Sequence, residues 1–127
     1  MKNYEISIHI PQQIENFMNI MATPQPDVGQ LERIKNNILN LIPDDTFHKD
    51  IMDYENRRKT KIKQLIDKAI QSIKTLVQTK NTQELFIDID EIRKDVAEAL
   101  STVESDYWTK IEQYMISWLN NSGNIEE

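Results

Sequence analysis

The chain contains no cysteine and only two glycines among its 127 residues. Without cysteine it can form neither a disulfide framework nor a zinc site with cysteine ligands, a composition that is typical of a reducing compartment. So few glycines argue against a sheet joined by tight turns, because such turns need residues that tolerate a positive φ. Residues 44–122 hold neither glycine nor proline. These absences favour an all-α protein.

Long hydrophobic runs are also missing from the sequence. No apolar stretch approaches the roughly 20 residues that cross a bilayer, and the amino terminus lacks the basic and apolar segments of a signal peptide. We therefore expect a cytoplasmic protein that does not contact a membrane. The net charge of −6 argues against general binding to duplex nucleic acid, and the length predicts a single domain, residues 1–127.

Residues 44–122 predict two long amphipathic helices that form an antiparallel hairpin. Apolar residues recur there at the three-and-four spacing of one helical face. The first half contributes Phe47, Ile51, Tyr54, Ile62, Leu65, Ile66, Ala69, Ile70, Ile73, Leu76 and Val77, and the second half contributes Leu85, Ile89, Ile92, Val96, Leu100, Val103, Tyr107, Ile111, Tyr114 and Trp118. Polar residues 79–83 interrupt the pattern, so we place the turn there, with Asn81 as a helix cap.

Charge supports the same coiled-coil-like pairing of the two halves. Residues 57–80 carry eight Lys or Arg against one Asp, whereas residues 82–127 carry three against eleven Asp or Glu. Folding the chain back at Asn81 places Ile70 opposite Ile92, Arg58 opposite Glu104 and Lys74 opposite Asp88. Exposed pairs contribute little stability, but they select the register.

Residues 11–43 predict two short helices before the hairpin. Pro11 suits a first helical turn, Asp27 with Gln30 forms a capping box that opens the second helix, and Pro43 ends it. The short connection to the hairpin ties both helices to its open end, where Trp108, Met115 and Leu119 widen the apolar stripe. We expect a four-helix bundle at that end, followed by a short tail, residues 123–127.

Residues 1–10 predict an extended arm. Tyr4, Ile6, Ile8 and Ile10 alternate with polar residues, which is the period of a half-buried strand. Such a segment can bind a partner by strand addition. We favour the simpler interpretation that the arm lies over the bundle.

The closed end of the hairpin predicts an interaction surface. Five apolar residues widen the stripes there beyond one face: Leu65, Ala69, Leu76, Phe86 and Ile87. A two-helix tip cannot bury all of them, and large exposed apolar patches mark interfaces. We expect a homodimer, because twofold association is commonest, or a helical protein partner. The alternative is that the amino-terminal arm covers the tip.

No pattern of residues predicts catalysis or a bound cofactor. His9 and His48 are far apart, no Glu-x-x-His motif of di-iron bundles occurs, and no glycine-rich phosphate loop is present. We therefore assign no catalytic, cofactor or metal residue. The sequence favours a non-enzymatic interaction or assembly module.

Two charged groups leave other functions open. Glu91, Asp95 and Glu98 share a helical face, as the magnesium ligands of an all-α nucleotide pyrophosphatase would, although such a row is usually a solvated face. The basic residues Arg57, Lys59, Lys61 and Lys63 would suit a nucleic-acid accessory protein that binds phosphates. We favour the simpler interpretation that they complement the acidic second helix.

Overall fold

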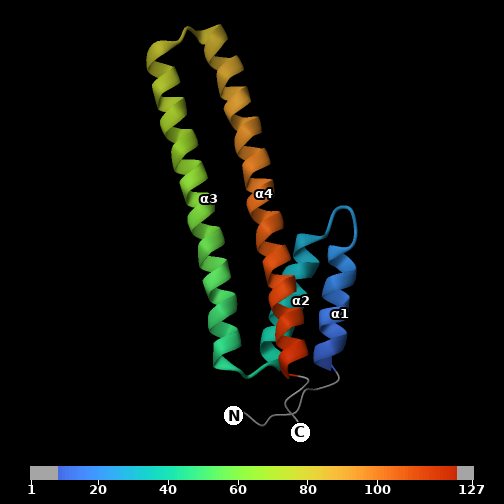
Figure 1. Cartoon of the computed structure of the whole chain (residues 1–127). Helices are drawn as coiled ribbons and strands as arrows, with labels where there is room; N and C mark the ends of the chain where they lie inside the picture. Colours follow the sequence, from blue (N-terminus) through green and yellow to red (C-terminus); the bar gives the residue numbers. More distant parts are fainter. Residues whose placement is uncertain (1–8, 123–127) are drawn as a thin grey trace. The chain divides into compact units, whose positions relative to one another are not determined.

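The computed structural model describes residues 9–122, and every regular element in this range is an α-helix (Figure 1). The helices are α1 (His9–Met21), α2 (Val28–Leu41), α3 (Asp45–Thr79) and α4 (Thr82–Ser122). The predicted all-α class is confirmed, with two short helices followed by two long ones.

The chain divides into two compact units. The bundle unit consists of Met1–Asp53 and Trp108–Glu127, and the hairpin unit consists of Tyr54–Tyr107. Each long helix therefore contributes one part to the bundle unit and one part to the hairpin unit.

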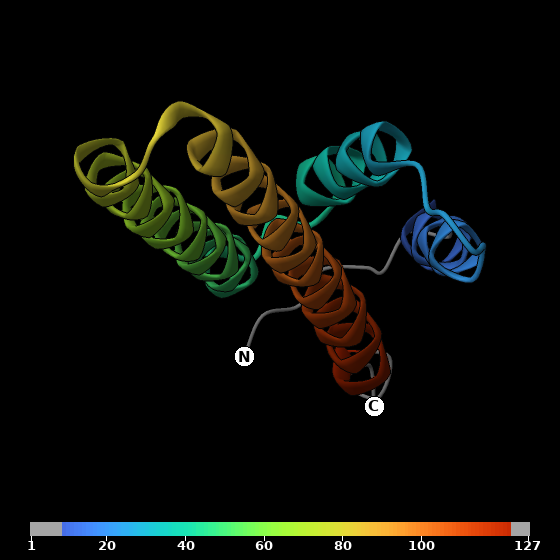
Figure 2. The ribbon, with the colours of Figure 1, turned by 90° about the horizontal axis from the view of Figure 1, so that it is seen from above.

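The bundle unit contains the hydrophobic core. Its buried apolar side chains come from all four helices and the α2–α3 connection: Ile10, Ile14, Phe17, Leu31, Ile38, Ile42, Phe47, Ile51, Trp108, Ile111 and Met115. Ring contacts join the helices, since Phe17 lies 5.9 Å from Trp108 and Phe47 lies 5.3 Å from Tyr114 between ring centroids. Figure 2 shows α1 and α2 lying beside each other in this unit. The expected four-helix core is confirmed.

Side-chain caps define where three of the helices begin. Asp27 Oδ1 accepts a hydrogen bond from the Gln30 backbone N–H at 3.3 Å. Asp44 Oδ1 accepts from Thr46 N–H at 2.9 Å, and Asn81 Oδ1 accepts from Glu84 N–H at 3.1 Å. Each bond satisfies a donor that the first helical turn leaves unpaired. The predicted caps at Asp27 and Asn81 are thereby confirmed.

The first helix begins earlier than the sequence pattern predicts. Ile10 lies in the first turn of α1 and is only 1% exposed, packed in the core with Ile14 and Phe17. Its assignment to an extended arm is therefore wrong. Ile10 fits both the alternation of residues 4–10 and the helical spacing that follows, and burial in the core decides in favour of the helix. Pro11 is accommodated because a first-turn residue needs no N–H partner. The remaining arm residues, Tyr4, Ile6 and Ile8, lie outside the described residues.

The hairpin unit consists of two antiparallel helical segments joined by the turn at residues 80–81 (Figure 1). A stripe of half-buried side chains runs along each segment and defines the seam between them. On α3 these residues are Ile62, Leu65, Ala69, Ile73 and Leu76, and on α4 they are Leu85, Ile89, Ile92, Val96, Leu100 and Val103.

The predicted pairing placed Ile62 and Ile73 correctly in the seam, but the other seam residues of α3 each lie one residue earlier than predicted. Ile66, Ile70 and Val77, which we expected in the seam, are exposed, whereas Leu65, Ala69 and Leu76 are half-buried. Both sets have helical spacing, and one residue step rotates a side chain by about 100° around the helix. The spacing on α3 alone therefore could not decide which set faces α4.

Candidate functional site

The hairpin unit carries a group of exposed apolar side chains that we call the distal surface. Its residues and their exposed fractions are Ile66 (42%), Ile70 (44%), Val77 (57%), Phe86 (67%) and Ile87 (63%). Phe86 and Ile87 were predicted as interface residues. The other predicted interface residues, Leu65, Ala69 and Leu76, are half-buried in the seam directly beside the distal surface.

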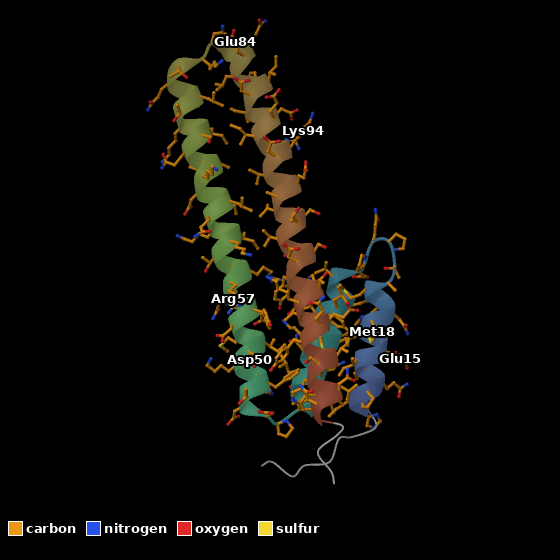
Figure 3. The ribbon with its side chains drawn as sticks, in the orientation of Figure 1. Glu15, Met18, Asp50, Arg57, Glu84 and Lys94 are labelled. Carbon is orange, nitrogen blue, oxygen red and sulfur yellow. The ribbon has the colours of Figure 1, made fainter. Side chains whose placement is uncertain are left out.

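The distal surface is exposed because the hairpin unit contains only two helical segments. Tyr107, the last residue of the unit, is its one buried side chain, and every residue of this unit is described. Two helices can cover only one stripe of each other, so apolar residues beyond that stripe remain in water. Figure 3 shows the side chains along both segments, with Glu84 marking the first turn of α4.

A polar cluster crosses the seam at the other end of the hairpin unit. Arg58 Nη1 donates to Glu104 Oε1 at 3.3 Å, and the guanidinium carbon lies 4.3 Å from the centroid of the Tyr107 ring. The Tyr107 hydroxyl donates to Glu55 Oε2 at 3.3 Å. The predicted pairing of Arg58 with Glu104 is confirmed. Arg58 combines a charge-assisted hydrogen bond with a cation–π contact, and this arrangement fixes the register of the two helices.

The predicted basic residues do not form one patch. Arg57, Lys59, Lys61 and Lys63 are all exposed on α3. Residues two apart on a helix point in nearly opposite directions, so Arg57 and Lys61 lie on one side and Lys59 and Lys63 on the other. Lys63 pairs with Asp67 at 3.6 Å, and Arg57 lies over the Tyr54 ring at 5.6 Å.

The predicted acidic residues Glu91, Asp95 and Glu98 are exposed on α4. Across residues 9–122, no group of three His, Cys, Asp or Glu side chains has an arrangement that could hold a metal ion. The nearby Asp90 accepts hydrogen bonds from Arg93 at 2.6 Å and is paired with Lys94 at 3.3 Å. The Arg93 and Lys94 contacts hold the pKa of Asp90 below its ordinary value.

The two histidines have separate positions in the bundle unit. His9 is exposed at the start of α1. His48 Nε2 lies 2.7 Å from the carbonyl oxygen of Ile42, the residue after α2. A proton on Nε2 would be donated to this carbonyl, so His48 links the first turn of α3 to the end of α2.

A buried lysine is the main polar feature that the sequence analysis did not identify. Lys35 is 2% exposed in the bundle unit. Its Nζ lies 2.6 Å from Glu32 Oε2 and 5.8 Å from the centroid of the Trp108 ring. Lys35 stands four residues after Leu31 and three before Ile38, so helical spacing alone could have placed it on the buried face of α2.

None of the helices within residues 9–122 combines the length and apolar character of a transmembrane segment. Comparison of the chain with known protein families, with curated proteins and with solved structures finds no match in any of the three. The geometry of the two units therefore provides the basis for a functional proposal.

Proposed function

We propose that this chain is a non-enzymatic helical assembly module that associates with itself through the distal surface of the hairpin unit. The observation that carries the proposal is the exposure of five large apolar side chains on a unit of only two helical segments. Several large apolar side chains exposed on so small a unit are typical of an interface.

The energetic argument is a comparison between the two units. The bundle unit buries Phe17, Phe47 and Trp108 almost completely, whereas Phe86 in the hairpin unit remains 67% exposed. Fully burying a large apolar side chain contributes about 1.5–3 kcal/mol. Covering the exposed parts of the five distal side chains would therefore contribute several kcal/mol, before the cost of association is subtracted.

The mass of the protein in solution tests this proposal. Light scattering at micromolar concentration should give twice the 15.0 kDa mass of the chain. The substitutions Val77→Asp and Phe86→Asp place a charge on the distal surface and should each shift the mass to that of a monomer. Both residues are exposed, so their replacement should leave the helical circular dichroism unchanged.

Gln64→Asp is the matched control, because Gln64 is also exposed on α3 but precedes the seam residue Leu65 instead of following it. This variant should keep the dimer mass. A monomeric mass for the unsubstituted protein would refute self-association. Equal dimer masses for Val77→Asp, Phe86→Asp and the control would show that the contact lies elsewhere.

A further inference from the structure

Most of the distal surface lies on a single face of the hairpin unit. Each exposed α3 residue of this surface directly follows a half-buried seam residue, and Phe86 on α4 directly follows the seam residue Leu85. One residue step rotates the side chain by about 100° in a fixed sense. Because the two segments run antiparallel with their seams facing each other, this rotation carries the side chains of both to the same face.

The exposed Ala97, which follows Val96, belongs to the same face. Ile87 follows Leu85 by two residues and points away from the seam. The shared face, which we call the docking face, therefore consists of Ile66, Ile70, Val77, Phe86 and Ala97, with charged residues between them.

Charge is segregated between the two helices of the hairpin unit. Residues 54–79 of α3 carry seven Lys or Arg and two Asp or Glu. Residues 82–107 of α4 carry two Lys or Arg and eight Asp or Glu.

On the docking face itself, Lys63 and Lys74 of α3 each follow a seam residue, whereas α4 presents Asp90 together with Arg93. A second copy that places α3 on α3 would therefore bring lysines toward lysines. A copy that places unlike helices together would pair them with opposite charge.

Two hairpins can stack face to face about a twofold axis in two ways. In the first way, the axis is perpendicular to the helices and parallel to the docking face, and α3 packs on α3 of the other copy. In the second way, the axis is parallel to the helices, and α3 packs on α4 of the other copy. We infer that the docking face binds a second copy of this chain about an axis along the helices, so that each basic α3 segment packs against an acidic α4 segment. This inference rests on the proposed self-association and adds its orientation.

The Arg58–Glu104 hydrogen bond sets which residues of the two helices lie at the same level. A twofold axis along the helices keeps each residue at the same height along the hairpin. Residues of α3 in one copy therefore lie opposite residues of α4 in the other copy that have the same height. Val77 of one copy then lies opposite Phe86 of the other, and Ile66 lies opposite Ala97. Lys74, which is exposed on α3, comes opposite Asp90. Twofold symmetry produces each of these contacts twice.

Disulfide trapping tests the orientation directly, because the chain has no cysteine of its own. One version would carry Ile66→Cys, and a second version, with a tag that changes its mass, would carry Ala97→Cys. After unfolding, refolding together and mild oxidation, the mixture should give a disulfide between the two versions. Neither version alone should form one. The matched control replaces Ile66→Cys by Gln64→Cys, on the opposite face, and should give none.

A charge exchange provides a second measurement that does not alter the apolar contacts. Lys74→Glu and Asp90→Lys each create two repulsive pairs in a homodimer, whereas a mixed dimer of the two variants restores both attractive pairs. The mixed dimer should form with an affinity roughly tenfold above that of either homodimer, as expected for two partly exposed ion pairs.

The outcomes separate the orientation from self-association itself. A dimer mass together with a disulfide from Ile66→Cys alone, or with no preference for the charge-exchanged mixture, would overturn the inferred orientation and leave the proposed function intact. A monomer mass for the unsubstituted protein would overturn both. The mixed disulfide together with preferential mixed dimers would support the orientation.

Discussion

Arg58 and Glu104 join the two helices of the hairpin unit through a hydrogen bond of 3.3 Å between Arg58 Nη1 and Glu104 Oε1. Both side chains are partly exposed, so water screens the pair and its net contribution is small. Arg58 also lies against the Tyr107 ring, and its Nε is buried without a hydrogen-bond partner. The arginine therefore contributes more through packing and register than through the ion pair.

A double-mutant cycle on this pair separates the two contributions. Arg58→Ala should lower the free energy of unfolding by about 1–2 kcal/mol, because it removes both the pair and the contact with Tyr107. Glu104→Ala should cost less. The coupling energy between the two substitutions should be roughly 0.5–1 kcal/mol, measured by denaturant unfolding. Equal losses for the two single variants would contradict the packing role of Arg58.

Lys35 should tolerate an apolar replacement of similar length. Lys35→Met keeps most of the buried volume, and the partner carboxylate of Glu32 is exposed enough to remain in water. We expect the free energy of unfolding to change by less than about 1 kcal/mol, because replacing a buried charge by a packed apolar group is often neutral. Lys35→Ala should cost about 2–4 kcal/mol through the cavity that it leaves. Similar large losses for both variants in urea unfolding would show that the ammonium itself stabilises the fold.

The cap of α4 gives a local prediction for the turn of the hairpin. Asn81→Ala removes the acceptor for the Glu84 N–H and should lower the free energy of unfolding of the hairpin unit by about 0.5–2 kcal/mol. Asn81→Asp keeps an acceptor at the same position and should retain most of this stability. Amide exchange of residues 82–86 measures the effect, and equally fast exchange in both variants would be evidence against the cap.

The stability of the bundle unit should depend on the protonation of Glu112. Burial raises the pKa of this carboxyl above its ordinary value of 4.5, so the folded state binds the proton more tightly than the unfolded state does. The stability from this protonation is fully present below pH 4.5 and is lost as pH rises through the folded pKa. Glu112→Gln should therefore be more stable than the unsubstituted protein at neutral pH, by less than about 1 kcal/mol because the residue is only partly buried.

Melting temperatures measured as a function of pH provide the check on Glu112. The curves of the variant and the unsubstituted protein should approach each other in acid and separate as pH rises above the ordinary carboxyl range. Glu15→Gln, at an exposed position on α1, is the control and should leave the melting temperature nearly unchanged. A variant less stable than the parent at neutral pH would refute the assignment.

Local signals in the sequence were sufficient for much of the fold. The caps at Asp27 and Asn81 depend on residues within one helical turn, and the pairing of Arg58 with Glu104 follows from the position of that turn. The predicted pairing of Lys74 with Asp88 is wrong. Asp88 pairs instead with Lys80, whose Nζ lies 3.5 Å from Asp88 Oδ2. Lys80 directly follows α3, and its long side chain reaches the first turns of α4.

Features that depend on tertiary packing were less accessible to sequence reasoning. Ile10 satisfies two periodicities at once, and only the core of the bundle unit selects the helix. The choice between Leu65 and Ile66 as a seam residue depends on the rotation of α3 against α4, which spacing along α3 alone does not determine. Lys35 was overlooked because a charged residue is rarely fully buried, although its spacing is that of the buried face.

The distribution of the core has a consequence for how the protein opens. Apart from Tyr107, every fully buried apolar side chain within residues 9–122 belongs to the bundle unit. Local opening is least costly where few apolar contacts must be broken. Backbone amides between Ile62 and Leu100 should therefore exchange with deuterium long before those of α2, and their exchange should slow as protein concentration rises. The proposed self-association would add apolar contacts to the hairpin unit, so it would slow this local opening without being required for the helices to form.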